Sequence, residues 1–141
     1  MVPAVLPPGD LVHSRYGIGV RLPGPLHALN EGLAFLLEVA AIVALAWWGF
    51  TTGGNVFLNI VLGVGTPVAA MVLWGLFAAP RARFKVALPL VLSVKAVVFG
   101  AGGLAFYGVG HATVAIVFAV IVVLNTTLAT LDREAHFHAA R

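Results

Sequence analysis

The stretch that decides the fold is residues 26–49, LHALNEGLAFLLEVAAIVALAWWG. It is long and apolar enough to cross a bilayer, because a spanning helix needs about 20 mostly apolar residues. Glu38 lies near its centre, where an ionisable side chain costs about 2.5 to 3.5 kcal/mol and normally faces a partner or a cavity. In a helix, Glu31 and Glu38 share one face about 10 Å apart along the axis, with Asn30 beside them. The stretch therefore predicts a membrane span with one polar face.

The composition of the whole chain indicates an integral membrane protein. Of the 141 residues, 61% are hydrophobic and only 9% are charged, and the mean hydropathy is +1.05, which is too apolar for an ordinary soluble domain. The net charge of +3 does not indicate a nucleic-acid partner, because the few basic residues lie between apolar segments. The chain has no cysteine, which excludes disulfides, thiolate metal sites and a cysteine nucleophile.

Three further apolar segments follow the first. The four predicted spans cover about residues 26–49, 56–78, 84–106 and 111–131, with a flexible Pro- and Gly-rich tail at 1–25 and a polar tail at 132–141. Gly63, Gly65 and Pro67 predict a bend in the second span. The predicted fold is an all-α, four-helix bundle that passes through the membrane several times.

The basic residues predict the orientation of the bundle. With four spans, every Lys and Arg outside the spans falls on one side of the membrane, and the other two loops carry none. These bases are Arg15, Arg21, Arg81, Arg83, Lys85, Arg133 and Arg141. Since basic loops stay in the cytoplasm, both termini are expected there.

Two opposite charges lie at similar depths in different predicted spans. Glu38 is near the centre of the first span and Lys95 is near the centre of the third. Pairing them reduces the desolvation penalty without abolishing it, so the pair indicates specificity or function more than stability. A register-fixing salt bridge and a functional role are both open. The acids and bases predicted to be catalytic are Glu31, Glu38 and Lys95.

A second polar group is expected nearer the cytoplasm. Asn30 and Glu31 in the first span and Asn125 in the fourth fall in the same half of the membrane, and Trp74 and Arg81 are at a compatible height. The predicted substrate-binding residues are Asn30, Trp74, Arg81 and Asn125. The alternative for Asn125 is an interhelical hydrogen bond, worth less than about 1 kcal/mol, and for Trp74 an ordinary interfacial aromatic.

Motifs for cofactors and metals are not found in the sequence. His136 and His138 are two residues apart in the polar tail without a third ligand in view, so no metal site is predicted. No nucleotide-binding glycine pattern, HExxH, GxSxG or EF-hand loop is present. We therefore expect no cofactor.

The sequence resembles the YrdB-like family of small four-span bacterial membrane proteins. The resemblance covers about residues 26–131 and is carried by the first span, by LWGLFAAPRAR at 73–83 and by VFAVIVVLNTTL at the end of the last span. It implies the four-span fold and a bacterial inner-membrane location. The residues at positions matching the family pattern are Asn30, Glu38, Trp74, Pro80, Arg81 and Asn125. The family position of Lys95 is usually acidic, so the lysine is a departure.

The first functional hypothesis is an enzyme that holds a lipophilic small molecule between its helices. Glu31 or Glu38 would act as acid or base, and Lys95 would be the charge partner. Cyclisation, isomerisation and epoxide opening fit, because none of them needs a redox cofactor, a nucleotide or a metal, and a water-free cavity suits them.

Two alternatives stay open at this point. A membrane-embedded acid in a four-span protein also suits proton-coupled transport, for which a homo-oligomer would be needed, although Lys95 would neutralise Glu38 and repel a cationic cargo. The other alternative is a structural or accessory subunit whose polar residues lock the helices together. In every case membrane lipids are the expected surroundings.

Overall fold

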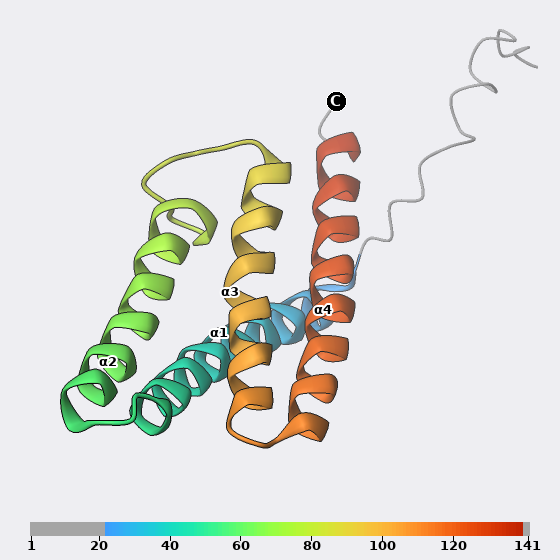
Figure 1. Ribbon diagram of the computed structural model, residues 1–141. Coiled ribbons are helices and arrows are strands. Elements are labelled where there is room, and N and C mark those ends of the chain that lie inside the picture. Colours follow the sequence, from blue (N-terminus) through green and yellow to red (C-terminus); the bar gives the residue numbers. More distant parts are fainter. Residues whose placement is uncertain (1–21, 140–141) are drawn as a thin grey trace, which may run out of the picture.

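A computed structural model describes residues 22–139 and contains four long helices (Figure 1). Each is long and apolar enough to cross a membrane, and the protein is a multi-pass membrane protein whose outer surface contacts lipid. The helical elements are α1 (Gly24–Thr52), α2 (Val56–Leu73), a π-helical turn η1 (Trp74–Ala78), α3 (Leu88–Gly108) and α4 (Ala112–Ala139). Most of the predicted N-terminal tail, residues 1–21, lies outside the described part.

Prolines set the beginnings of two helices. Pro25 lies in the first turn of α1 and Pro89 in the first turn of α3, where the missing N–H has no intrahelical partner to lose. As a result α3 begins at Leu88, whereas the sequence analysis began this span at residue 84. Within α2, the helix is continuous through Pro67.

The last helix extends beyond the apolar segment. Helix α4 continues to Ala139 and so includes most of the residues assigned to the polar C-terminal tail. The first part of this extension carries Asp132, which is buried. The side chains of His136 and His138 lie outside the described part of the structure.

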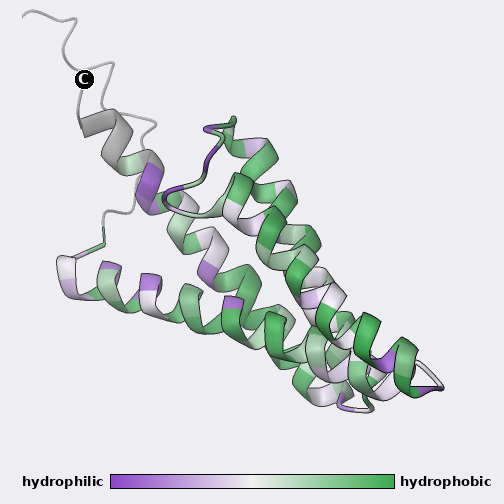
Figure 2. Cartoon of the chain, turned by 90° about the vertical axis from the view of Figure 1, so that its left-hand side faces the viewer, coloured by the Kyte–Doolittle hydropathy of each residue, from purple (hydrophilic) through white to green (hydrophobic). Residues whose placement is uncertain are grey.

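Helix α1 is the common packing partner of the bundle. In Figure 1 it crosses obliquely behind α3 and α4 and meets the lower end of α2, and it packs against each of the three. The turn η1, rather than α2 itself, makes the main contact between the second span and α3. Figure 2 shows the largely hydrophobic colouring of the helices and the way the N-terminal half of α1 diverges from the α2–α3 side.

The bundle has two chemically different ends. The "turn end" carries the short connections 53–55 and 109–111, and the "polar end" carries the loop 79–87 together with the beginning of α1 and the C-terminal part of α4. At the turn end the helices approach very closely. A Cβ atom on Gly102 of α3 would lie 2.7 Å from the Cβ of Ala41 in α1, and one on Gly49 would overlap the backbone of α2 at Leu62 and Gly63.

The core between the helices consists of small and aromatic side chains. Ala41 and Ala44 of α1 are completely buried, and the ring of Phe118 in α4 makes edge contacts with Phe99 and Phe106 of α3. Small residues allow helix backbones to approach each other, which is how helices gain packing energy in lipid. The core therefore fixes α1 against α3 and α4 from the turn end toward the middle.

Candidate functional site

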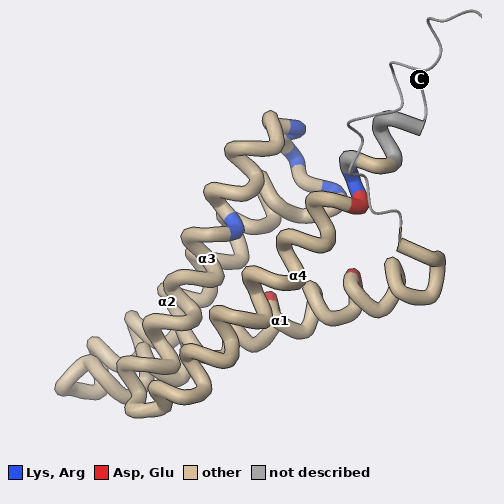
Figure 3. The backbone as a smooth tube through the Cα atoms, turned by 90° about the vertical axis from the view of Figure 1, so that its right-hand side faces the viewer, with Lys and Arg blue, Asp and Glu red and all other residues tan. Residues whose placement is uncertain are grey.

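The charged residues gather away from the turn end. Figure 3 shows Lys, Arg, Asp and Glu along the middle of the bundle and at the polar end, and residues 39–80 and 96–131 contain no charged residue. The predicted site residues divide into three groups in the structure: one around Glu38, one pair of asparagines, and two side chains at the surface.

The first group contains the two opposite charges in the interior of the spans. The Nζ atom of Lys95 in α3 lies 3.9 Å from Oε1 of Glu38 in α1. This distance permits Coulomb attraction but is too long for a hydrogen bond, which needs about 2.7 to 3.2 Å. The two side chains are 24% and 15% exposed, respectively. The structure thus brings Glu38 and Lys95 together without sealing them from their surroundings.

Trp74 completes this group from a third element. It begins η1, where the N–H of Ala79 donates to the carbonyl oxygen of Trp74 over 2.8 Å. The indole N–H lies near the Glu38 carboxylate, but Nε1 is buried and completes no hydrogen bond with any described residue. Glu38 is therefore approached by one N–H group from η1 and one from α3.

The turn η1 is held in place by the loop that follows it. Ala79 is extended because it precedes Pro80, so the helix ends there. The N–H of Phe84 donates to the carbonyl of Leu76 over 3.0 Å, and the rings of Phe77 and Phe84 stack with centroids 5.7 Å apart. These contacts fix the backbone that carries Trp74.

The second group is the asparagine pair between α1 and α4. The Nδ2 of Asn125 donates to the side-chain oxygen of Asn30 over 2.7 Å and to its backbone oxygen over 2.9 Å, and Asn125 is only 4% exposed. Because the Asn125 amide donates to Asn30 of α1, the pair forms an interhelical hydrogen bond between α4 and α1.

Sequence reasoning missed the buried residue Asp132. It is 2% exposed, accepts a hydrogen bond from the N–H of Leu22 over 3.0 Å, and lies 2.7 Å from Nδ1 of His27. The signal was present: Asp132 follows Asn125 by seven residues and His27 precedes Asn30 by three, spacings that keep each pair on one helix face. It was overlooked because hydropathy falls at this point and a tail was expected.

The two remaining predicted residues are at the surface. Glu31 is 73% exposed and reaches Nε2 of His27 at 3.4 Å. Arg81 is exposed in the loop 79–87. Neither is among the groups that the structure brings to Glu38, so the two candidate acids, Glu31 and Glu38, lie in different environments.

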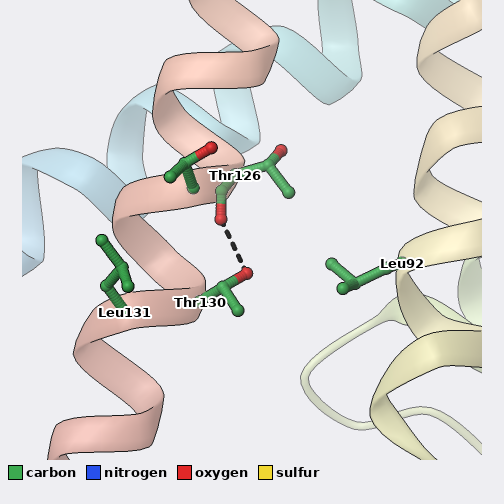
Figure 4. A pocket seen from close by; sticks show the side chains of 5 residues that line it. Leu92, Thr126, Thr130 and Leu131 are labelled. Carbon is green, nitrogen blue, oxygen red and sulfur yellow. Dashed lines mark hydrogen bonds between the residues drawn. The ribbon is translucent and has the colours of Figure 1, made fainter. Parts of the chain in front are cut away.

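A shallow groove lies between α3 and α4, with a volume of about 280 Å³ (Figure 4). It is lined by Leu92, Thr126, Thr127, Thr130 and Leu131, and none of the predicted site residues lines it. The hydroxyls of Thr127 and Thr130 donate to carbonyls one turn earlier in their own helix. The groove is open, largely apolar and separate from Glu38.

Among the side chains that the structure describes, which exclude those of residues 134 and 136–139, no group of three or more His, Asp or Glu could hold a metal ion. Around Glu38, the available chemistry is that of a carboxylate, an ammonium group and an indole N–H. Such a set can move a proton and stabilise an oxygen that gains negative charge.

The model of a family described as a protein of unknown function, DUF2568, matches residues 32–123. The match includes Glu38, Trp74, Arg81 and Lys95. It supports a small family of unknown function but not the YrdB-like name suggested by the resemblance. No curated protein and no solved structure matches the chain. Since the match covers more than half of the 141 residues, the chain belongs to the DUF2568 family.

Proposed function

We propose that this protein binds a lipophilic small molecule inside the bacterial cytoplasmic membrane and acts on it by acid–base chemistry at Glu38 and Lys95. The reaction would be a cofactor-free rearrangement such as an isomerisation or a cyclisation. Proton transfer between a carboxylate and a bound substrate needs neither a nucleotide nor a metal.

The observation that carries this proposal is the geometry of the Glu38–Lys95 pair. A pair that only joined two helices would be expected to close into a hydrogen-bonded contact, because unscreened charges in a membrane are costly. Here the charged atoms are 3.9 Å apart and both side chains are partly exposed. The pair is close enough to compensate its charges and open enough to meet a substrate arriving from the lipid.

The same pair weighs against proton-coupled export of a cation. An exchanging carboxylate must alternate between a proton and a cationic cargo, but Lys95 already supplies a positive charge at 3.9 Å. We also propose that the polar end and both termini lie in the cytoplasm. The basic residues outside the spans support this orientation, because loops rich in Lys and Arg stay on the cytoplasmic side.

Native mass spectrometry of the detergent-purified protein tests the proposal. We expect the wild type to be a monomer carrying a lipophilic molecule, and Glu38→Gln and Lys95→Met to lose it. Lys85→Met is the matched control, because Lys85 is an exposed lysine of the loop 79–87 and its replacement should leave the ligand bound. Gel filtration verifies that each variant is folded.

Two results of this experiment would contradict the proposed function or its site. A wild-type protein without ligand, in which Glu38→Gln and Lys95→Met both lower the thermal midpoint and Lys85→Met does not, would mean that the pair is structural, and the proposed function would be abandoned. A ligand that stays bound in all three variants would equally remove Glu38 and Lys95 from the site.

A further inference from the structure

Two N–H donors lie near the Glu38 carboxylate without completing a hydrogen bond to it. Nε1 of Trp74 is buried and has no hydrogen-bond partner among the described residues. The ammonium group of Lys95 is 3.9 Å from the Glu38 carboxylate, beyond hydrogen-bonding distance. A buried N–H that lacks an acceptor is costly, and more so where no water can reach it.

The position of Trp74 is held by the backbone rather than by a side-chain partner. The π-helical hydrogen bond from Ala79 to Trp74 and the stacked rings of Phe77 and Phe84 fix η1 to the loop that follows it, and η1 packs against α3. The indole N–H is thus preorganised near Glu38, which is what stabilisation of a developing charge requires.

We propose that Trp74 and Lys95 form an oxyanion site for the carbonyl oxygen of a lipophilic, enolisable ketone, and that Glu38 is the base that moves its proton. This inference rests on the proposed function and specifies its substrate class. A carbonyl oxygen is an acceptor for both N–H groups and gains negative charge as the adjacent carbon loses its proton.

The step balances without a further reactant. The Glu38 carboxylate takes a proton from the carbon next to the carbonyl, the C–H electron pair forms a carbon–carbon double bond, and the carbonyl π pair moves to the oxygen. The oxygen then accepts hydrogen bonds from Trp74 and Lys95. Where the ketone carries a β,γ double bond, Glu38 returns the proton to the γ-carbon of the dienolate while the electron pair on the oxygen re-forms the carbonyl. The double bond thereby moves next to the carbonyl, and nothing is oxidised or reduced.

Binding of 4-nitrophenol to the full chain in detergent tests the oxyanion site, because its phenolate resembles an enolate and absorbs visible light, unlike the phenol. We expect the wild type to bind the phenolate form preferentially. Trp74→Phe, which removes the N–H and keeps an aromatic ring, should weaken binding about 10-fold, and Lys95→Met should abolish the preference for the phenolate. Trp47→Phe is the control, since Trp47 lies near the turn end beside His111.

Glu38→Gln gives a signature that a structural role would not produce. Removing the carboxylate removes a negative charge next to the bound phenolate, so this variant should bind the phenolate more tightly than the wild type does. If Trp74→Phe does not fold, replacement of Trp74 by 3-benzothienylalanine, which has sulfur in place of N–H, provides the same comparison.

Three results would overturn the inference. Phenolate binding that is equal in the wild type and in Trp74→Phe would remove Trp74 from the site. A wild type that carries a Glu38-dependent ligand in native mass spectrometry but does not bind the phenolate would leave the proposed function standing and exclude the oxyanion assignment. If both the co-purifying ligand and phenolate binding are missing, the proposed function falls as well.

Discussion

At the turn end the helices are joined by close packing of small residues, whereas at the polar end they are joined by hydrogen bonds and charged side chains. At the turn end, Gly49 and Gly102 let α1 approach α2 and α3 so closely that a methyl group would not fit. Toward the polar end, α1 meets α4 through the pairs Asn30–Asn125 and His27–Asp132, and Glu38 meets Lys95 across a 3.9 Å gap. The bundle is therefore closed where it is apolar and open where it carries chemistry.

This difference follows from the surroundings of a membrane protein. Between apolar helices in lipid there is no hydrophobic driving force, so close packing of small residues has to supply the attraction. Polar residues contribute less to stability, but each has a specific partner and therefore specifies which helix faces are joined. The two ends should respond differently to substitution.

The largest effect is expected at the turn end. Gly102→Leu should lower the free energy of unfolding by about 3 kcal/mol or more, because its Cβ alone would already lie 2.7 Å from that of Ala41. Gly100→Leu is the matched control on the same helix, since nothing lies within 4 Å of a Cβ at this position. Thermal unfolding in detergent, followed by circular dichroism, measures both. Equal loss in the two variants would show that close packing at Gly102 is unimportant.

An intermediate effect is expected where Asp132 contacts His27 and Leu22 at the polar end. Asp132→Asn should destabilise the protein by about 1.5 kcal/mol, because the Asn replaces a buried carboxylate that accepts from the N–H of Leu22 and pairs with His27. Glu31→Gln, which changes the exposed acid on the other side of His27, should cost less than about 0.5 kcal/mol. Urea unfolding at neutral pH compares them, and a larger loss for Glu31→Gln would contradict the burial argument.

The smallest effect is expected for the uncharged contact between Asn30 and Asn125. Asn125→Ala removes two hydrogen bonds to Asn30, and such interhelical bonds are worth about 0.6 kcal/mol on average in a membrane protein. Thr127→Ala on the same helix is the control, because its hydroxyl is exposed and bonds only to its own helix. If Asn125→Ala were as damaging as Gly102→Leu, the contrast between the two ends would be lost.

Much of the fold could be predicted because hydropathy and helix length are set by the membrane itself. Four segments of about 20 apolar residues give four spans whatever their packing. The exact ends depended on local chemistry: α3 begins at Leu88 because Pro89 suits a first turn, a signal that lay in the sequence but was not used. The π-helical turn at Trp74 carries no such signal, since it depends on packing against α3 and on the loop that follows.

Residues of the candidate site were foreseeable only where depth in the membrane was informative. Glu38 and Lys95 were predicted to pair because both lie near the centres of their spans, and the structure brings them together. The seven-residue spacing put Glu31 on the same helix face as Glu38, but spacing cannot say whether other helices cover that face at both positions, and Glu31 is exposed. Asp132 was missed because hydropathy marked the end of a span while the helix, and its polar face, continued.

The central place of α1 also bears on how the protein is made. Helix α1 is synthesised before α2, α3 and α4, and each of them packs against it, so each of these spans meets its partner already in the membrane. Helix α2 can pair with it as a hairpin, and α3 and α4 can follow in turn, in keeping with assembly from the N-terminus during synthesis. The contacts of Asn125 and Asp132 with α1 join the last span to the first and therefore mark the completion of assembly.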